Sequence, residues 1–599
     1  MKKYAIVLFV MAAVAACTSD DPLEEYYNGG GGNGSAGGTT QLDGSDMSVE
    51  LASLDVAIDS TAMDETLDTP DETDEYYEDY VETYQAENTL LIHYNGTDDA
   101  TVSGSADGVS VVVSGGHVTV TSGAKKMAYV LSGSSADGCF KIYSDYKFQL
   151  TLNGVSLTNT SGAAINNQGK RMYLVLADGT TNTLADGSTY STPADEDEKA
   201  TLFSEGKLPI SGAGRLRVYG RGKNGIASDD YVLLRPQANV YVQSSSGHGI
   251  KANDGVIIRG GVLCVEVSAA GKKGINSEGA VSISGGRTTL VATGGVETSD
   301  GDYTGAAGLK SDSTLVVSGG TLLCKATGQG GKGISVDQTM NVSGGTIHAV
   351  ATGSNYGSSL SGRYGSSDSS VKAKAVKTDG DLTVGGGNIM ARANSHEGIE
   401  TKGTLTVTGG HIASYSSDDA INSASHTTIS GGYVFACSTG NDGLDANGNL
   451  YIKGGNVYAI GSSSPEVAID ANTEGGYKLY VTGGNLVAIG GLESGSSLSQ
   501  SCYQVGSWSS GSWYALSSGG ETVLAFRTPS ATSSQSRALV VSTAGTATLV
   551  AGITVAGGTT IFGGMGNVEG TCSGGTAVSL SAYSGSNGGG QGGGPGGRR

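Results

Sequence analysis

Two sets of polar side chains recur beside one repeated position in this sequence. The position is an Ile, Leu or Val after a small residue, usually Gly, and the residues that flank this dipeptide carry the charge. In the earlier repeats the flanking residues are mostly lysines, namely Lys251, Lys273, Lys310, Lys332, Lys374 and Lys377. In the later repeats they are carboxylates, with amides beside them, namely Asp418, Asp419, Asn441, Asp442, Asp445 and Asp470. If the repeats stack, the two sets form a lysine ladder and a carboxylate ladder along one edge.

Each ladder predicts a ligand because stacked like charges repel. Lysines about 5–10 Å apart repel unless an anion lies between them, and a carboxylated polysaccharide supplies anions at regular spacing. Stacked carboxylates are relieved by a hard cation, and Ca²⁺ takes about six to eight oxygen ligands. We therefore expect an acidic polysaccharide at the lysine ladder and Ca²⁺ at the carboxylate ladder. The alternative for both is a solvated polar edge in which unlike charges keep the repeats in register.

The repeat that positions these residues is a Gly-Gly frame. Within a unit, Leu322, Cys324 and Ala326 alternate with Leu323 and Lys325, which is the period of a strand with one buried side. Three short strands per unit predict an all-β fold, a right-handed parallel β-helix of about 10–12 coils. Propeller blades need about 40–50 residues, so this period is too short for them. The Gly pairs begin at Gly260, Gly285, Gly319, Gly344, Gly386, Gly409, Gly431, Gly454 and Gly483, and most steps are 22–25 residues. The long steps are predicted loop insertions at residues 295–305 and 354–371.

The N-terminal segment predicts export and a lipid anchor. Residues 1–17 combine Lys2 and Lys3 with a short apolar run and end in Val-Ala-Ala-Cys, so we expect a lipoprotein signal peptide with lipidation at Cys17. An ordinary secretory signal is the alternative. The expected location is the outer membrane at the cell surface, with the lipid anchor as the only membrane contact.

The remaining boundaries follow from composition. Residues 18–86 are Gly-rich and then acidic and contain no Lys or Arg, which predicts a disordered stalk; a cation-binding or partner-binding tail is the alternative. Residues 87–491 carry the parallel β-helix, residues 492–585 a small C-terminal β cap or sandwich, and residues 586–599 a disordered Gly-rich tail. The net charge of −22 makes nucleic acid an unlikely partner. The cysteines match no zinc motif, and we expect free thiols, with Cys502 and Cys572 as one possible pair.

Two stretches resemble a known family. Residues 152–158 (Leu-Asn-Gly-Val-Ser-Leu-Thr) and 176–184 (Leu-Ala-Asp-Gly-Thr-Thr-Asn-Thr-Leu), with the repeated frame, look like carbohydrate-binding β-helix proteins typified by a clostridial cellulose- and polygalacturonate-binding surface protein. The resemblance covers about residues 100–490. It implies a fold related to pectate lyases and binding of acidic plant polysaccharide on a Ca²⁺-bearing β-helix. The early coils depart from the family pattern because lysines replace the acidic residues that precede many Gly-Ile dipeptides.

Three functions remain open on the sequence. The first is a non-catalytic surface lipoprotein that binds pectin-like acidic polysaccharide. The second is a Ca²⁺-dependent polysaccharide lyase, in which Lys374 or Lys377 would serve as the base. The third is an adhesive or structural spacer.

Overall fold

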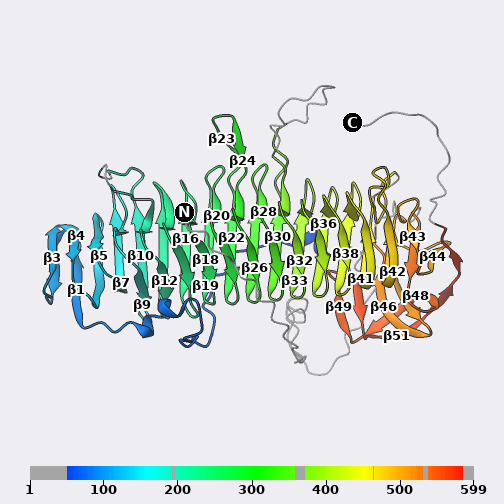
Figure 1. Cartoon of the computed structure of the whole chain (residues 1–599), viewed down its shortest axis with the longest axis horizontal. Helices are drawn as coiled ribbons and strands as arrows, with labels where there is room; N and C mark the ends of the chain where they lie inside the picture. The colour runs from blue at the N-terminus through cyan, green and yellow to red at the C-terminus, as the bar shows by residue number, and fades with distance from the viewer. Residues whose placement is uncertain are drawn as a thin grey trace.

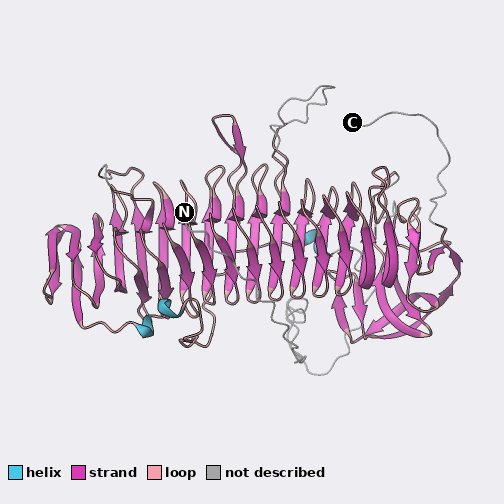
Figure 2. Cartoon of the chain, in the orientation of Figure 1, coloured by secondary structure: helices cyan, strands magenta, loops and turns pink. Residues whose placement is uncertain are grey.

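The protein is an elongated rod built almost entirely of β-strands (Figures 1 and 2). The computed structural model describes residues 50–191, 193, 196–357, 371–462, 465–530 and 537–584. Helical structure in these residues is limited to the 3-10 turns η1 (Glu50–Ser53), η2 (Tyr77–Asp79) and η3 (Val81–Thr83). The predicted fold class, an all-β parallel β-helix, is confirmed. The signal peptide, Cys17, residues 18–49 and the tail at 586–599 lie outside the described residues.

One coil consists of three short strands, one on each face of the rod. In the coil of residues 250–267, β17 lies on a face that we call the anchor face, β18 on the middle face and β19 on the strap face. Strands of the anchor face form a 14-stranded sheet, and those of the other two faces belong to a 30-stranded sheet. The rod is therefore longer than the predicted 10–12 coils, because several coils before residue 224 stack in the same way without the regular Gly-Gly frame.

The strand bounds follow the three faces. The anchor face contains β3 (Val109–Ser114), β4 (Gly116–Ser122), β6 (Gly138–Ser144), β8 (Ile165–Asn167), β11 (Ala200–Ser204), β14 (Asn224–Ser228), β17 (Ile250–Ala252), β20 (Lys273–Ser277), β25 (Ala307–Ser311), β28 (Lys332–Val336), β31 (Lys374–Thr378), β34 (Ile399–Thr401), β37 (Ile421–Ser423) and β40 (Leu444–Ala446). The middle face contains β12 (Leu208–Ser211), β15 (Tyr231–Leu234), β18 (Gly255–Ile258), β21 (Ala280–Ile283), β26 (Leu315–Val317), β29 (Met340–Val342), β32 (Leu382–Val384), β35 (Leu405–Val407) and β38 (Thr427–Ile429). The strap face contains β13 (Arg215–Gly220), β16 (Asn239–Ser244), β19 (Val262–Val267), β22 (Arg287–Ala292), β27 (Thr321–Ala326), β30 (Thr346–Ala351), β33 (Asn388–Ala393), β36 (His411–Ser416) and β39 (Tyr433–Ser438). The N-terminal coils add β1 (Asn88–Asn95), β2 (Asp98–Ser103), β5 (Met127–Ser135), β7 (Phe148–Asn159), β9 (Met172–Leu176) and β10 (Thr181–Asp186), and β41 (Leu450–Ile460) and β42 (Leu479–Ile489) each run through two faces of the last coils.

The repeated apolar residue stacks in register through the rod. Ile250 pairs with Ile275, Ile275 with Leu309 and Leu309 with Ile334, all in parallel strands. The same column continues through Val376, Ile399, Ile421, Leu444 and Ile469. These side chains are fully buried in one continuous core, so burial of apolar area fixes the register of every coil.

The Gly-Gly pairs form the corner between the middle and strap faces. The second Gly of the pair has a left-handed backbone, as at Gly345 with φ +74°. A Cβ there would lie 2.6 Å from the carbonyl oxygen of Gly319 in the coil below. Both the backbone conformation and the close stacking of coils therefore require Gly at this corner.

The prediction of a disordered stalk is wrong for the described part, residues 50–86, which we call the strap. The strap begins beside β33 and β36, where Leu51 and Leu54 are buried against Met390 and Ala413. It ends at the first coils, where the Tyr84 hydroxyl donates to the carbonyl of Met127 at 2.9 Å. Residues 50–86 thus run back along most of the rod before the chain enters β1 (Figure 1).

Ion pairs hold the strap, and they explain why an acidic sequence is ordered here. Arg235 contacts Asp68 and Glu82, both at 2.7 Å, and is 1% exposed. Arg259 pairs with Asp74, and this lowers the pKa of Asp74 to about 2. The carboxylates that would repel one another in an isolated stalk are neutralised by arginines of the rod, which are remote in sequence.

The C-terminal region has two parts. Strands β44 (Cys502–Val505), β47 (Leu539–Ser542) and β52 (Leu580–Ala582) extend the sheet of the last coil in antiparallel pairing. A six-stranded antiparallel sheet contains β45 (Trp513–Ser518), β46 (Glu521–Arg527), β48 (Ala547–Ala556), β49 (Thr559–Ile561), β50 (Gly566–Val568) and β51 (Thr571–Val578). This sheet packs on the strap face, where Phe435 and Tyr458 meet Phe526 and Phe562. The cap thus lies against the side of the rod as well as at its end.

The described cysteines are all free thiols, so the possible pair between Cys502 and Cys572 is not formed. Cys264 and Cys437 point outward from the coils, yet they are buried. The strap covers the first and the cap sheet covers the second.

Two short strands, β23 (Glu297–Ser299) and β24 (Asp302–Thr304), form a hairpin in the insertion at 295–305, and β43 (Ser497–Leu498) follows β42. Among the described residues there is no helix with the length and apolar character needed to cross a membrane.

Candidate functional site: the charged edge of the anchor face

The predicted ladder residues lie at the start of successive anchor-face strands, and they form two columns. The first column precedes the buried anchor and pairs Lys273 with Ala307, Ala307 with Lys332 and Lys332 with Lys374. The second column follows the anchor and contains Lys251, Asn276, Lys310, Ser335, Lys377, Glu400, Asn422 and Asp445 in register. We call these columns and the loops that precede them the charged edge.

Most of the predicted lysines already have acidic partners within the protein. Lys251 lies 3.3 Å from Glu278, and Lys377 lies 2.6 Å from Asp379. Lys310 pairs with Asp312 at 2.8 Å and with Asp337 at 2.5 Å. The charges of these three lysines are therefore compensated on the surface, as in a solvated polar edge.

Lys273 and Lys332 differ from the others. Lys273 is 8% exposed and donates to the carbonyl of Gly271 at 2.5 Å. Lys332 makes no ion pair with any residue that the structure describes. Burial, with the nearby lysines Lys377, Lys374 and Lys273, lowers the pKa of Lys332 to about 8. Burial and Lys272 lower the pKa of Lys273 to about 8 as well. These two ammonium groups are the uncompensated part of the lysine ladder.

The lysine and carboxylate halves meet in a compact charged network. Lys374 is buried between Glu397, at 3.1 Å, and Glu400. Burial lowers the pKa of Lys374, whereas its ion pairs lower the pKa of Glu400 against the opposing effect of burial. Glu400 also contacts Lys402. This network is a closed set of ion pairs, so Lys374 is held in place by two carboxylates.

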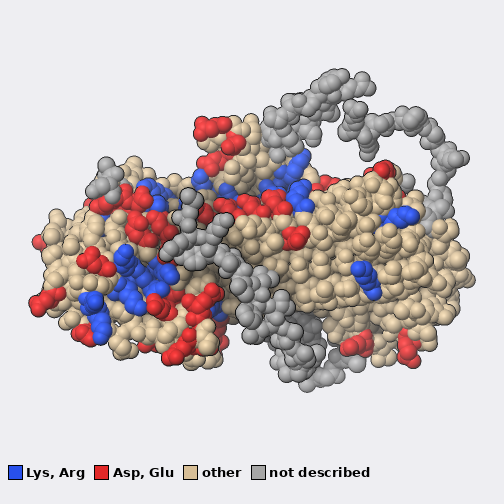
Figure 3. Space-filling view, viewed as in Figure 1, with Lys and Arg blue, Asp and Glu red and all other residues tan. Residues whose placement is uncertain are grey.

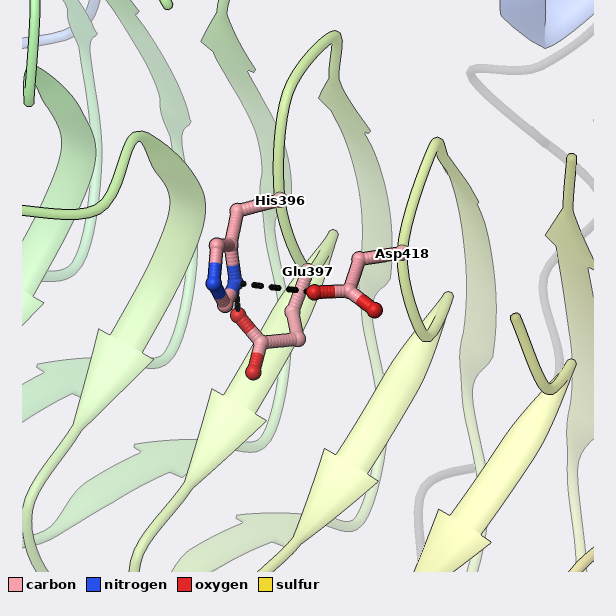
Figure 4. A group of neighbouring side chains, drawn as sticks. All are labelled: His396, Glu397 and Asp418. Atoms are coloured by element: carbon pink, nitrogen blue, oxygen red, sulfur yellow. Dashed lines mark hydrogen bonds and ion pairs between the residues drawn. The ribbon is translucent and has the colours of Figure 1, made fainter. Parts of the chain in front are cut away.

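Beside it, His396, Glu397 and Asp418 come together from the loops before two successive strands (Figure 4). The His396 imidazole lies against Glu397 and 3.3 Å from Asp418, and Asn441 donates to the other Asp418 oxygen at 2.9 Å. Burial lowers the pKa of His396 to about 4. The ligand atoms of the three residues lie within 4.8 Å of one another, a spacing that suits a metal ion. Lys374 already pairs with Glu397, but it is shared with Glu400, and Asp418 has no Lys or Arg partner among the described residues, so the group keeps a net negative charge.

The remaining predicted metal ligands form a row rather than one cage. Asp419 accepts hydrogen bonds from Asn422 and from the backbone N–H of Asp442, both at 3.1 Å. Asp442 in turn accepts from the N–H of Val467 at 2.5 Å, and Asp470 from that of Ala471 at 2.8 Å. In the described part of the chain, the compact groups of three acidic or histidine ligands are the one above and Asp197, Glu205 and Asp229. Of the six predicted ligands, only Asp418 belongs to such a group.

The Asp side chains of this carboxylate row lack positively charged partners among the described residues. No Lys, Arg or His of the described residues pairs with Asp419, Asp442, Asp445 or Asp470. Burial and the neighbouring carboxylates raise the pKa of Asp419 to about 8. Burial is also the main reason that the pKa of Asp442 rises to about 7 and that of Asp445 to about 6. Burial and a hydrogen bond with Glu493 raise the pKa of Asp470 to about 9.

The predicted ligand sets left out four members of the edge, although two of them, Glu397 and Glu400, flank the Gly398-Ile399 dipeptide and so fall in the predicted columns. His396, Glu397 and Glu400 lie at the junction of the two ladders, where the sign of the charge changes. Glu493 belongs to one further coil, because Leu492 bridges to Ile469 and so places Glu493 beside Asp470. The signal for this coil was present, since Gly491-Leu492 repeats the anchor dipeptide.

Comparison with known proteins agrees with a carbohydrate-binding rod. A family model described as a carbohydrate-binding domain-containing protein matches residues 114–271. This match includes both motif stretches, so the resemblance inferred from them is confirmed. A relative described in the same words, from Acetivibrio thermocellus, is 32% identical over 138 residues, which are 22% of this chain and 46% of that protein. The chain thus spans about half the length of this curated relative.

A solved structure of a polysaccharide lyase-like protein from C. thermocellum is also similar. It has 20% identity and a TM-score of 0.27, and the alignment covers 53% of this chain and 96% of that one. The family match ends at residue 271. Most of the charged edge lies beyond it, in coils that the match does not reach.

Proposed function

We propose that this protein is a non-catalytic surface lipoprotein that binds acidic, pectin-like polysaccharide along the charged edge, with Ca²⁺ at the carboxylate row. One observation carries the proposal. At one end the same edge holds Lys273, which is buried, and Lys332, which is half-buried, without acidic partners among the described residues, and at the other it holds buried carboxylates without cations. An uncompensated buried charge is costly, so each end is suited to a ligand of opposite charge.

The carboxylate row fits calcium in its chemistry. All of its donors are hard oxygens from Asp side chains, with Asn422 and Asn441 beside them, as Ca²⁺ requires. Because the predicted ligands spread over several coils, the protein would supply only part of each coordination shell. Water and the carboxylates of the polysaccharide would supply the rest, which makes calcium a bridge between protein and ligand.

The lysine end fits a carboxylate of the same ligand. In the first column, Lys273, Ala307 and Lys332 occupy three successive coils. Only the small side chain of Ala307 therefore lies between the two uncompensated ammonium groups. At about 4.8 Å per coil, they start about 10 Å apart. Lys251, Lys310, Lys374 and Lys377 would contribute less, because each already has an acidic partner.

The proposal also includes where the protein lies in the cell. A lipid on Cys17 would hold the protein at the outer membrane, with the rod exposed at the cell surface. The match to a carbohydrate-binding family over residues 114–271 supports a polysaccharide partner.

The test is retention on immobilised polygalacturonate, with Ca²⁺ and with a chelator, while the absorbance of unsaturated products is recorded. We expect retention that the chelator abolishes and no product. Asp419→Asn with Asp442→Asn should abolish the calcium effect, whereas Asp178→Asn, an exposed carboxylate elsewhere on the rod, should not. Absence of retention under all conditions would overturn the proposal in favour of an adhesive or structural spacer.

One observation favours the second candidate, a Ca²⁺-dependent lyase. A lyase needs a base that is neutral near physiological pH, and the pKa of Lys332 is lowered to about 8. Lys374 and Lys377, the bases expected from the sequence, are instead held in ion pairs. Product formation that disappears in Lys332→Met would establish the lyase.

A further inference from the structure

The strap covers a second basic surface of the rod, on a different side from the charged edge. We call the set Arg235, Arg259 and Arg287 the arginine row. Arg235 and Arg259 directly follow Leu234 and Ile258, which pair in adjacent coils, and Arg287 opens β22 in the next coil. The three arginines thus belong to three successive coils, whose backbones lie about 4.8 Å apart along the rod. Arg235 and Arg259 share one column, whereas Arg287 lies across the Gly-Gly corner, in column with Val262.

Every member of the row is bound by a strap carboxylate. Arg235 donates to Asp68 at 2.7 Å, Arg259 pairs with Asp74, and Arg287 lies 3.1 Å from Asp59. Tyrosine rings of the strap add a second kind of contact. The Tyr80 ring lies 4.4 Å from the Arg235 guanidinium carbon, and the Tyr76 ring lies 5.0 Å from that of Arg259.

The fully buried residues of the strap lie only at its two ends. Leu51, Leu54 and Val56 are buried at one end, and Asp79, Tyr80 and Tyr84 at the other. Between them, residues 57–78 include no buried residue, and the strap forms no strand pairs with the rod. Polar contacts and the packing of Tyr76 against Tyr231 hold this middle part, and Asp59 of the Arg287 pair is 52% exposed. A pair of this kind, which reaches solvent, contributes little. Asp68 and Asp74 are only 22% and 15% exposed, so their pairs with Arg235 and Arg259 are stronger and can be exchanged only for carboxylates that enter the same partly buried sites.

We propose that the arginine row is a second binding surface for acidic polysaccharide and that residues 57–78 occupy it as an internal competitor. The choice of ligand rests on the proposed function. A polyuronate presents a carboxylate and the apolar face of a ring at each unit. Residues 57–78 present Asp74 and the Tyr76 ring to Arg259 in the same way, and they present Asp68 to Arg235, whose ring contact, Tyr80, belongs to the buried end of the strap. Without residues 57–78, Arg259 and Arg287 lose their carboxylate partners and Arg235 keeps only Glu82, so the surface needs one of the two polyanions.

The alternative is that the strap covers the arginine row permanently, as a structural element, and that no ligand replaces it. The two cases differ in what happens when the contacts of the middle part are weakened. If the strap competes, loosening it raises the apparent affinity of the row, because the ligand no longer has to displace it. If the strap is only structural, loosening it lowers stability and leaves binding unchanged.

The experiment compares two triple variants of the full chain. The loosened variant carries Glu65→Gln, Asp68→Asn and Asp74→Asn, each at a residue that contacts the covered surface. The matched control carries Asp64→Asn, Glu72→Gln and Glu75→Gln, which remove the same charge from strap residues that are exposed and form no ion pair with the described residues. Binding of polygalacturonate oligomers is measured by calorimetry with excess chelator, so that calcium at the carboxylate row does not contribute, while the lysine end is the same in every variant.

We expect the loosened variant to bind about tenfold more tightly than the wild type, and the control to bind as the wild type does. Adding Arg235→Gln and Arg259→Gln to the loosened variant should remove the gain. Equal binding by the loosened and control variants overturns the proposal, as does a gain that persists without the arginines.

A measurement on the wild type keeps the test independent of variant folding. Polygalacturonate should increase the rate of amide hydrogen exchange within residues 57–78 and leave the core strands unchanged. Unchanged exchange at saturating ligand overturns the proposal. Loss of calcium-dependent retention alone contradicts the proposed function of the charged edge, whereas a loosened variant that fails to bind in chelator contradicts only the arginine row.

Discussion

Arg235 lies 2.7 Å from the carboxylate of Asp68, although 167 residues separate the two in the chain. The guanidinium is 1% exposed, and it also binds Glu82. This contact shows how an acidic segment, which is typical of disorder when considered alone, becomes part of the folded rod. Figure 3 shows acidic and basic side chains interspersed over the N-terminal half of this face, consistent with mutual neutralisation.

The contact between Arg235 and Asp68 predicts how much stability the protein loses when the Asp68 carboxylate is removed. Asp68→Ala should lower the free energy of unfolding by about 2 kcal/mol, because hydrogen bonds to charged groups contribute about 1.5–3 kcal/mol each. Asp64→Ala, an exposed position in the same segment, should change it by less than about 0.5 kcal/mol. Thermal denaturation followed by circular dichroism measures both. Equal effects of the two substitutions would mean that the ion pair is not what orders the strap.

The carboxylate row predicts a stability that falls with rising pH when calcium is absent. The folded-state pKa is about 8 for Asp419 and about 7 for Asp442, above the ordinary value of 3.8. Between these values the folded state keeps protons that the unfolded chain releases. This contribution is therefore complete below about pH 4 and is lost as the pH rises through about 8.

The measurement is the melting temperature in chelator across this pH range, with Ca²⁺ added in a parallel series. Ca²⁺ binds the ionised carboxylates, so it should raise the melting temperature most at the alkaline end. Asp419→Asn should flatten the pH dependence in chelator. A melting temperature that does not respond to calcium at any pH would contradict a calcium site in this row.

Lys332 predicts opposite effects on stability and binding. It is half-buried and has no ion pair with any described residue, so Lys332→Met should raise the melting temperature of the free protein. The same substitution should weaken binding to polygalacturonate. Lys478→Met, an exposed lysine of the last coils, is the control and should change neither quantity. Lower stability together with unchanged binding would show that the Lys332 ammonium is satisfied within the protein.

The Gly-Gly corner predicts a strong dependence on the close stacking of coils. Gly345→Ala adds a Cβ 2.6 Å from the carbonyl oxygen of Gly319, at a φ of +74°. Gly154→Ala is the matched control, because its φ is +70° but nothing lies within 4 Å of the added carbon. The control should cost about 1–2 kcal/mol from the left-handed backbone alone. Gly345→Ala should cost clearly more, and equal losses would show that the coils can shift apart at the corner.

The sequence by itself determined the coil. Alternation of apolar residues, the Gly-Gly corner and the repeated Ile or Leu predict a parallel β-helix and the register of its core, because the same side chain must be buried at the same point of every coil. It also placed the lysines and carboxylates on one edge, since residues that flank a stacked position stack as well. The count of coils was too low because the first coils satisfy the same packing without the glycine frame.

Only the tertiary structure decided which of these charges are compensated. Lys310 and Lys332 look equivalent in the repeat, yet Lys310 has two acidic partners and Lys332 has no ion pair with the described chain. The partner of Lys310 from the next coil, Asp337, lies in a turn whose path the repeat does not specify. In the same way, the ordered strap could not be inferred from local composition. Its order depends on arginines far away in the sequence, and the energy of an ion pair is set by distance and burial in space rather than by position along the chain.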